Sequence, residues 1–431
     1  MTTSMSGTEN GVAEAYRVML VEADPRIGGS GRSLETIIAG VDRHRFHLSA
    51  VCRPDGPIAQ AVRELGVEPH WPASRFLNGR RLGARAAWVG WLARLIRRRR
   101  IDLVHVNDVA GFRLAGLAAR LAGAPAVCHI RMARSREGLA WSFAWAAPDA
   151  VIYNSRGMSD YTRPLLSASV EKAHGVVAPN AVPTDRFRPS VSVPSAKARM
   201  GWPTDEATVT VVSNLSPLKG QDVFVEAAAK VAVSLAAPVA FHLVGRDLTP
   251  DGRLTGTLQR RCRALGLGGQ VHFDGVLDDV VPAYQASDVV VWSGKAVSVC
   301  PSGDGTPVKQ VGFPRCVIEA AACGRPLVLS DTPGAAEAVQ PDRTALVVRP
   351  EDPEAMARAI LVLLNDRDRR EAMGRAARSL AEARFGIAQH GRLIGRVYEN
   401  AIFASRARAG WAGRPPEVAP SAAMSGRAGP A

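Results

Sequence analysis

Long apolar runs are missing from this sequence. No segment approaches the ~18 consecutive apolar residues that a membrane-spanning helix needs. The first fifteen residues, MTTSMSGTENGVAEA, have neither the basic start nor the apolar centre of a signal peptide. These absences argue against an integral membrane protein and against a secreted one. We therefore expect a cytoplasmic protein whose membrane contact is at most peripheral, at the inner face of the cell membrane.

Cysteine is scarce as well. The chain has six cysteines in 431 residues, and none of them forms a C-x-x-C pair or has the spacing of a zinc site. This pattern predicts free thiols in a reducing compartment. No Asp-x-Asp of the kind that holds a divalent ion against a diphosphate is present either, so we expect neither a metal nor a cofactor.

Acidic residues are outnumbered by basic ones. There are 40 Asp and Glu against 54 Lys and Arg, which gives a net charge of +14, and most of the excess lies in residues 1–190. Such a surface favours polyanionic partners, among them phospholipid head groups, acidic glycans, diphosphate-linked lipids and nucleic acid. The sequence has no basic motif interleaved with aromatic residues and no zinc module, so we do not expect nucleic acid to be the partner.

What the sequence does contain is an alternation of short apolar runs and amphipathic stretches, repeated in two halves. The apolar runs predict strands at 16–21, 47–52, 102–106, 126–130, 150–154 and 175–178, and again at 208–212, 240–244, 271–273, 289–292, 327–329 and 345–348. Strands that alternate with helices predict parallel sheets covered on both faces, hence an α/β chain of two Rossmann-like domains. Ligands bind such sheets beyond the carboxyl ends of the strands, so residues that follow strands are the candidates for function.

One candidate segment follows the strand at 208–212. Residues 213–222, SNLSPLKGQD, place Lys219 in a turn that opens the next helix. A helix N-terminus presents free N–H groups and about half a positive charge, and the lysine adds a full charge, so the segment suits a diphosphate. Taken alone, it is also compatible with a surface turn and an ordinary solvated lysine.

A second candidate segment spans residues 312–339, GFPRCVIEAAACGRPLVLSDTPGAAEAV. Gly312 allows a ligand to approach the backbone closely, and Pro314 suits the first turn of a helix. Glu319 then lies about one and a half turns into that helix, where its carboxylate can accept both hydroxyls of a ribose while the helix N-terminus faces phosphate. Taken alone, Glu319 is also compatible with a charge on a helix surface.

Together these segments resemble the retaining family 4 glycosyltransferases, which have the GT-B fold of two Rossmann-like domains facing each other across a cleft. The resemblance covers about residues 16–400. It includes HLVGRD at 242–247, VHFDGVLDDVVPAYQASDVVV at 271–291, and VVAPNAVPTDRFRP at 176–189, where Ala181 replaces a glycine. So many motifs in the same order make a coincidence improbable.

The resemblance implies roles for individual residues. Lys219 matches the ligand of the donor diphosphate, Glu319 the ligand of its ribose, and Gly28 with Gly29 a glycine loop that approaches the donor from the opposite domain. The implied nucleotide-sugar-binding residues are Gly28, Gly29, Ser213, Asn214, Lys219, Gly245, Gly312, Phe313, Pro314 and Glu319. The implied catalytic residues are Lys219, Glu319, His129 and Arg131.

The segment CHIRMAR at 128–134 follows a strand, and family members carry a catalytic-site histidine near this place. Either His129 or Arg131 matches it, and a buried structural role for His129 is the alternative. His105 and Asn107, which follow another strand, are weaker candidates of the same kind.

Two positions depart from the family pattern. Asn214 stands where many members have an arginine, which leaves the phosphate to Lys219 and to backbone groups. Val311 stands where the family has the first glutamate of a Glu-x7-Glu pair, near the donor sugar. Valine accepts no hydrogen bond, so this contact with the sugar needs another explanation.

The stretch from 288 to 312 is longer than expected for such a unit by about a dozen residues. Asp304, Lys309 and Gln310 within it are candidates to replace the glutamate, and the backbone N–H groups of Gly312 and Phe313 are also available to the sugar. Otherwise the donor lacks the hydroxyls that the glutamate binds, or activity is impaired.

The expected domain organisation follows from the motifs and from composition. Residues 16–190 form an N-terminal Rossmann-like domain on the acceptor side, and residues 204–383 a C-terminal Rossmann-like domain that binds the nucleotide sugar. Between them we expect a linker at 191–203, and after them a helix at 384–405 that packs back on the N-terminal domain. The polar segment 1–15 and the Ala/Gly/Pro-rich tail 406–431 are expected to be disordered.

We therefore expect a retaining, metal-independent glycosyltransferase that moves a sugar from a UDP or GDP donor to a glycan or lipid-linked acceptor, in the synthesis of bacterial surface polysaccharides or glycoconjugates. A nucleotide-sugar epimerase on the same scaffold is one alternative, because fold alone does not settle function. A sugar-binding pseudoenzyme is another, because of Val311.

A basic run at Arg97–Arg100 ends the helix expected at 84–100, whose apolar stripe most simply packs on the sheet. The arginines alone can be a solvated helix end favoured by the helix dipole. The functional alternative is docking on anionic lipid, with Arg75, Arg80, Arg81 and Arg85 nearby in sequence.

Overall fold

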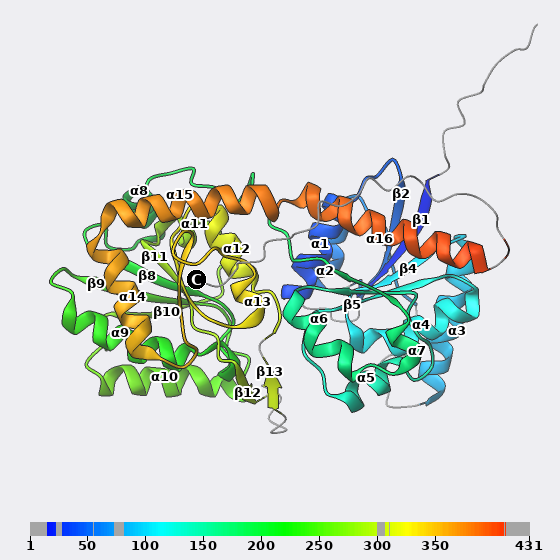
Figure 1. The fold of residues 1–431 in the computed structure, drawn as a ribbon, viewed down its shortest axis with the longest axis horizontal. Coiled ribbons are helices and arrows are strands. Elements are labelled where there is room, and N and C mark those ends of the chain that lie inside the picture. The colour runs from blue at the N-terminus through cyan, green and yellow to red at the C-terminus, as the bar shows by residue number, and fades with distance from the viewer. Residues whose placement is uncertain are drawn as a thin grey trace, which may run out of the picture.

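The computed structural model describes residues 15–22, 28–54, 56–72, 82–299, 307–309, 311–408 and 410. Most of the two segments expected to be disordered, together with Arg75, Arg80, Arg81, Asp304 and Gln310, lies outside the described residues. Within the described ranges the chain forms two α/β domains, each built on its own parallel sheet (Figure 1).

The N-terminal domain has a seven-stranded sheet within the described residues. Its strands are β1 (Tyr16–Val21), β2 (Phe46–Val51), β3 (Pro69–His70), β4 (Leu103–Val106), β5 (Ala126–Ile130), β6 (Ala150–Tyr153) and β7 (His174–Val177). Their order is β3-β2-β1-β4-β5-β6-β7, and every neighbouring pair is parallel. The helices are α1 (Gly29–Gly40), α2 (Pro57–Glu64), α3 (Leu82–Arg98), α4 (Val109–Ala122), α5 (Arg136–Phe143), α6 (Arg156–Thr162) and α7 (Ala168–Glu171), with a 3-10 turn η1 (Arg163–Leu165).

The C-terminal domain repeats this plan. Its six-stranded sheet contains β8 (Ala207–Val212), β9 (Val239–Val244), β10 (Val271–Gly275), β11 (Val289–Trp292), β14 (Leu327–Ser330) and β15 (Ala345–Val348). The order is β10-β9-β8-β11-β14-β15. The first helices are α8 (Val193–Met200), α9 (Gln221–Ser234), α10 (Arg253–Ala264), α11 (Val281–Ala286), α12 (Arg315–Ala322) and α13 (Pro333–Ala336), with 3-10 turns η2 (Pro217–Lys219) and η3 (Pro250–Gly252).

Each sheet is covered on both faces, as alternating strands and helices require. In the N-terminal domain α3, α4 and α5 bury Leu92, Phe112 and Leu139 on one face. On the other face α1 and the C-terminal helix α16 (Ile387–Arg408) bury Ile37 and Ile394. In the C-terminal domain α9, α10 and α14 (Pro353–Asn365) cover one face and α8, α11 and α12 the other.

Two segments differ in detail from the sequence-based expectation. Residues 191–203, expected as a linker, contain α8, whose Lys197 is buried and pairs with Asp288 at 2.7 Å. The long stretch before α12 contains an antiparallel hairpin, β12 (Val297–Val299) and β13 (Pro307–Lys309). Neither segment has a periodicity long enough to indicate its structure from sequence.

The last two helices return the chain to the N-terminal domain. Helix α15 (Arg367–Arg384) packs on α12, and α16 packs on α1, so the pair runs across both domains (Figure 1). At the crossing, a Cβ added to Gly391 would lie 1.7 Å from the carbonyl oxygen of Gly40, which explains why glycine stands there. Helix α16 extends to Arg408, three residues further than the sequence indicated.

Candidate functional site

The turn with Lys219 lies at the carboxyl end of β8, where the sequence places it. η2 ends at Lys219 and α9 begins at Gln221. Between them Gly220 has φ +66°, and a Cβ there would lie 1.9 Å from the carbonyl oxygen of Ser293. The Ser293 hydroxyl donates to the Lys219 carbonyl at 2.9 Å. The turn is therefore fixed against the segment that follows β11, and only glycine fits its tightest point.

Gln221 holds this turn from the inside. Its Nε2 donates to the Ser213 hydroxyl at 3.0 Å and to the Asn214 carbonyl at 3.1 Å, and its Oε1 accepts from the Ser216 N–H at 3.4 Å. Gln221 is almost fully buried. Sequence reasoning did not single it out, because an amide that bonds three loop groups has no local signature.

The Lys219 side chain carries a charge in an apolar setting. Its Nζ lies 4.7 Å from the centroid of the Trp292 ring, and burial lowers the pKa of the ammonium group. Within the described part of the chain no carboxylate forms an ion pair with it. A partly buried cation with no carboxylate partner suits an anionic ligand.

Gly245 joins this turn to the next loop of the sheet. It has φ +147°, and a Cβ there would lie 2.1 Å from the Ser213 carbonyl oxygen. The Asn214 Oδ1 accepts a hydrogen bond from the Arg246 N–H at 3.3 Å. Ser213, Asn214, Lys219 and Gly245 therefore lie in one loop cluster, and Asn214 itself is exposed and adds no charge.

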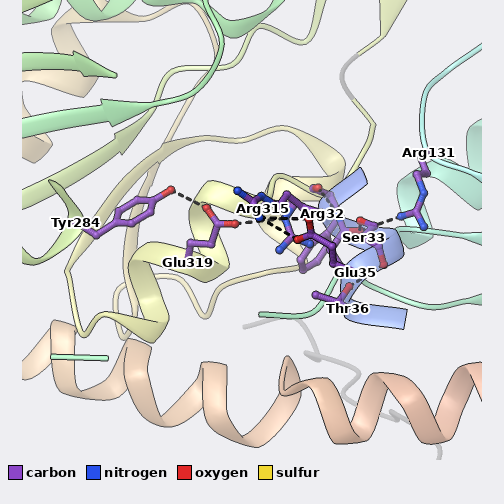
Figure 2. Close-up of polar contacts among 10 residues, drawn as sticks. Arg32, Ser33, Glu35, Thr36, Arg131, Tyr284, Arg315 and Glu319 are labelled. Carbon is purple, nitrogen blue, oxygen red and sulfur yellow. Dashed lines mark hydrogen bonds and ion pairs between the residues drawn. The ribbon is translucent and has the colours of Figure 1, made fainter. Parts of the chain in front are cut away.

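Glu319 lies on α12, which begins just after its N-cap residue Pro314. One carboxylate oxygen of Glu319 accepts from the Tyr284 hydroxyl at 2.9 Å, and the other accepts from Arg315 Nε at 3.3 Å (Figure 2). Burial and the nearby Glu319 carboxylate raise the pKa of Tyr284 well above its ordinary value, so the phenol stays a donor. Tyr284 thus fixes the orientation of Glu319, a partner that the sequence did not reveal.

Asn180 connects the two domains beneath α12. Its Oδ1 accepts from the Ser33 hydroxyl at 2.9 Å and from Arg131 Nη1 at 3.2 Å, and its Nδ2 donates to the Phe313 carbonyl at 2.9 Å. Figure 2 shows Ser33, Arg131 and the Glu319 group in one view, from segments far apart in the sequence. The segment that resembles an interdomain motif supplies this asparagine, although its contacts depend on three other segments.

Arg131 is buried in the N-terminal domain and faces this junction. It donates to the backbone carbonyl and to the side chain of Asn107, at 3.1 and 2.7 Å, and its own carbonyl lies 3.1 Å from where a Cβ on Gly312 would be. Burial lowers the pKa of the guanidinium to about 10. Arg131, Asn107 and Gly312 are thus brought together by the structure.

His129 lies beneath Arg131 and is fully buried. Its Nδ1 is 2.9 Å from Arg131 Nη2, and burial together with the Arg131 charge holds the pKa of the imidazole well below its usual range. His105 is also buried, bonded to the Tyr398 hydroxyl at 2.7 Å, and burial lowers its pKa to about 3. Both imidazoles are therefore neutral at physiological pH, and Arg131 is the charged group of this cluster.

Gly28 and Gly29 lie at the start of α1, with Gly28 as the N-cap residue. No atom of the described residues lies within 4 Å of a Cβ added at either position. With respect to the described residues, which do not include 23–27, the start of α1 therefore has open space beside it, unlike Gly220 and Gly245.

The Val311 side chain is packed in a hydrophobic core. It is 6% exposed and belongs to the hydrophobic core of the N-terminal domain, although it precedes α12 of the C-terminal domain. The Ser155 hydroxyl donates to its carbonyl at 2.5 Å. Nearby, the Glu337 carboxylate accepts the N–H groups of Arg156 and Gly157, both at 2.7 Å. This position therefore attaches one domain to the other.

Of the three candidates to replace the missing glutamate, the structure describes only Lys309. Its Nζ lies 5.5 Å from the centroid of the Tyr161 ring on α6, so the hairpin that carries it reaches the N-terminal domain. Across the described residues, no three His, Cys, Asp or Glu side chains are grouped as a metal site requires. In the same residues, no helix is long and apolar enough to cross a bilayer.

Two family profiles match the chain, one for each domain. Residues 27–186 match the profile described as Glycosyltransferase Family 4, and residues 193–380 match Glycosyl transferases group 1. The GDP-mannose-dependent alpha-(1-6)-phosphatidylinositol monomannoside mannosyltransferase of Mycobacterium tuberculosis is 31% identical over 394 residues, which are 86% of this chain and 94% of that protein. The D-inositol 3-phosphate glycosyltransferase 1 of Catenulispora acidiphila is 28% identical, over 71% of this chain and 74% of that protein.

Solved structures share the fold. The Anabaena protein HepE in complex with UDP and glucose matches with a TM-score of 0.72 at 21% identity, covering 88% of this chain and 98% of that chain. A glycosyltransferase from Rickettsia africae matches with a TM-score of 0.73 at 16% identity, covering 90% of this chain and 99% of that chain. At these identities the likeness concerns the fold alone.

The paired sheets, the lysine turn and the glutamate helix define a glycosyltransferase of the GT-B fold. With both profiles and a relative that matches along most of its length, the chain belongs to glycosyltransferase family 4. The predicted family, fold class and enzyme class are thereby confirmed. The residue roles and the domain limits are tested by none of these comparisons and stay predictions.

Proposed function

We propose that the protein transfers a hexose from a nucleoside diphosphate to a glycan or lipid-linked acceptor with retention of configuration, and that GDP-mannose is the donor to test first. The observation that carries the proposal is the partly buried Lys219, which has no carboxylate partner among the described residues and lies in a turn that opens a helix. The relative with the longest match quoted above is named for GDP-mannose and a phosphatidylinositol mannoside, which supports this choice of donor and a lipid-linked acceptor.

In this proposal each element of the site has one task. Lys219 and the N-terminus of α12 stabilise the negative charge that develops on the leaving diphosphate, because oriented donors and cations act strongly in a partly buried site. Glu319, held by the Tyr284 hydroxyl at 2.9 Å, accepts the ribose hydroxyls. The open start of α1 at Gly28 and Gly29 receives the sugar from the other domain.

Arg131 is the N-terminal-domain group that fits a role at the sugar, because it remains charged and reaches the Asn180 bridge. His129 fits a supporting role behind it, since its Nδ1 contacts the guanidinium. The reaction needs no metal in this scheme, because cations and helix N-termini neutralise the leaving group.

The direct test is a transfer assay. The purified protein is incubated with GDP-mannose, and separately with UDP-glucose and an ADP-sugar, with and without a phosphatidylinositol mannoside acceptor. We expect acceptor-dependent transfer, and NMR of the new linkage should show the donor's anomeric configuration. A changed sugar nucleotide formed without acceptor would instead identify an epimerase.

Binding without transfer would identify a pseudoenzyme, the alternative that the burial of Val311 favours. Thermal shift with the same nucleotides separates this outcome from a wrong choice of donor, because a ligand that binds the native state raises its apparent stability. We place the activity in the cytoplasm, with the acceptor reached at the inner face of the membrane, in bacterial surface polysaccharide or glycoconjugate synthesis.

A further inference from the structure

Arg315 is the first residue of α12, and its guanidinium group has a hydrogen-bond donor without an acceptor. Its side chain is 12% exposed, and its Nε donates to Glu319 Oε1 at 3.3 Å. Its Nη1 is buried and has no hydrogen-bond partner among the described residues. A buried charged donor without an acceptor is destabilising, so an arginine here needs a reason beyond packing.

The stability of α12 does not supply that reason. A positive charge at a helix N-terminus opposes the helix dipole. The pair with Glu319 also runs from the basic residue to the acidic one four positions later, which is the weaker orientation for a helical ion pair. The helix dipole and the orientation of the ion pair would both favour an uncharged residue at position 315 if only the stability of α12 were at stake.

A second guanidinium group, that of Arg131, lies near enough to Arg315 to be affected by its charge. Figure 2 shows Arg315 bonded to Glu319, with the Arg32 and Ser33 side chains of α1 in the same view. Arg315 is also one of the charges that depress the pKa of Arg131, after burial itself. Arg32 is paired with Glu35 at 3.0 Å on its own helix. An anion near the start of α12 would therefore reduce the repulsion between the Arg315 and Arg131 guanidinium groups.

The position on the helix identifies which part of the donor this anion is. Residues four apart lie on one face of a helix, so Arg315 is one turn nearer the helix N-terminus than Glu319, on the same face. With the ribose at Glu319, the diphosphate lies toward the N-terminus, where Arg315 stands. On the other loop Asn214 contributes no charge, so Lys219 is the one cation among the four residues of that cluster, Ser213, Asn214, Lys219 and Gly245.

We propose that Arg315 binds the diphosphate of the donor as a second cation beside Lys219. This inference rests on the proposed function, because it requires a nucleoside diphosphate in the site. It adds a donor-binding residue that stands outside the positions assigned from the sequence motifs. The guanidinium can keep its contact with Glu319 while its remaining N–H groups reach phosphate oxygens, which suits its fork of five donors.

The test compares each nucleoside diphosphate with its own nucleoside, because the two differ only in the diphosphate. Isothermal titration calorimetry measures binding of GDP, UDP, guanosine and uridine to the wild type, to Arg315→Gln and to Arg315→Lys. We expect Arg315→Gln to weaken the better-bound nucleoside diphosphate roughly 10- to 100-fold, as loss of a charge-assisted hydrogen bond does. Binding of the matching nucleoside should change less than threefold. Arg315→Lys keeps the positive charge and should lose less affinity for the nucleoside diphosphate.

The matched control is Arg367→Gln, which removes an exposed Arg–Glu pair of the same i, i+4 spacing on α15. It should bind all four ligands like the wild type. Equal diphosphate affinity in Arg315→Gln and the wild type would overturn the proposal. So would an equal loss for diphosphate and nucleoside, because that result indicates only a support for Glu319. A wild type that binds neither GDP nor UDP would instead overturn the proposed function itself.

Discussion

At the residue scale, we expect the charge on Lys219 to serve a ligand at the expense of the stability of the free protein. Nothing acidic among the described residues compensates it, and burial lowers its pKa below the ordinary 10.5. We expect Lys219→Met to slow turnover about 10²- to 10³-fold, equivalent to ~2.7–4 kcal/mol of transition-state stabilisation. Steady-state kinetics with the identified donor measures this. Turnover within threefold of the wild type would remove Lys219 from the phosphate site.

The same substitution has a pH-dependent effect on stability. The unfolded chain holds the Lys219 proton more tightly than the folded one, so the buried charge destabilises the folded state fully below the lowered pKa. This destabilisation disappears as the pH rises through that pKa toward 10.5. Without ligand, Lys219→Met should therefore be more stable than the wild type at pH 7, and the two should converge at alkaline pH. Denaturant unfolding at several pH values measures the difference, and a mutant less stable at pH 7 would contradict it.

Glu319 allows a second prediction at this scale. Its assigned contact is a charge-assisted hydrogen bond to ribose, worth roughly 1.5–3 kcal/mol. Glu319→Ala should therefore weaken the binding of nucleoside diphosphate and of free nucleoside alike. Glu371→Ala, which removes a carboxylate from the exposed pair on α15, is the matched control. Equal affinities for wild type and Glu319→Ala in calorimetry would show that the ribose lies elsewhere.

At the element scale, the segment before α12 acts as a connection between domains. Val311 packs in the core of the N-terminal domain, and its carbonyl accepts from Ser155. Val311→Glu restores the glutamate of the family pattern, yet it would bury an unpaired carboxylate. We expect a loss of stability of several kcal/mol and no gain in activity. Val311→Ala, which leaves only a small cavity, should lose less stability.

Melting curves and turnover of the two Val311 variants separate a structural role from a catalytic one. If Val311→Glu raised turnover without lowering the melting temperature, the side chain would have to turn toward the sugar. The conformation in which residue 311 is buried would then not be the reactive one.

Elements were predictable from sequence where one local pattern determined them. Runs such as VMLV at 18–21 are apolar throughout because this part of β1 is covered on both faces, so the strand is visible in the sequence. The short helices α5, α6 and α7 were not predicted. They have eight, seven and four residues, and segments this short show little helical periodicity. The turn at Lys219 was predictable because proline, lysine and glycine follow a strand in that order.

Long-range contacts of the site were not predictable in this way. Tyr284 reaches Glu319 across 35 residues, and Asn180 reaches Phe313 across 133. These residues are present in the sequence, but no local pattern indicates which of them contact each other. Likewise, a histidine near the carboxyl end of a strand is compatible with a catalytic and with a buried position, and only the packed structure shows that His129 of β5 is buried against Arg131.

At the scale of the whole molecule, the proposed mechanism gives the basic groups of both domains the task that a metal would otherwise have. Lys219 and Arg315 come from the C-terminal domain and Arg131 from the N-terminal domain. We therefore expect full activity in excess EDTA. Loss of activity that magnesium or manganese restores, with the protein still folded by circular dichroism, would contradict this prediction.

The distribution of charge over the molecule predicts how it meets a membrane. The apolar stripe of α3 is buried, with Leu92 and Ile96 almost inaccessible, so this helix offers lipid only its basic end. There, Arg97 donates to the Leu121 carbonyl and Arg99 pairs with Glu68 at 3.4 Å, while the helix end itself is exposed. Binding through this end must be electrostatic, at ~1 kcal/mol per charge near an anionic surface.

We therefore expect the protein to sediment with anionic vesicles at low salt and not with neutral ones. Binding should fall steeply as the Debye length shrinks from ~10 Å at 0.1 M salt to ~3 Å at 1 M. Replacing Arg97–Arg100 by glutamine should weaken it at low salt, whereas glutamine at Arg367, Arg369 and Arg370, on α15 of the other domain, should not. Because the apolar stripe is unavailable, no salt-resistant fraction should remain. Equal recovery with neutral and anionic vesicles, or none with either, would mean that these arginines only solvate a helix end, and would favour an acceptor that is not embedded in a membrane.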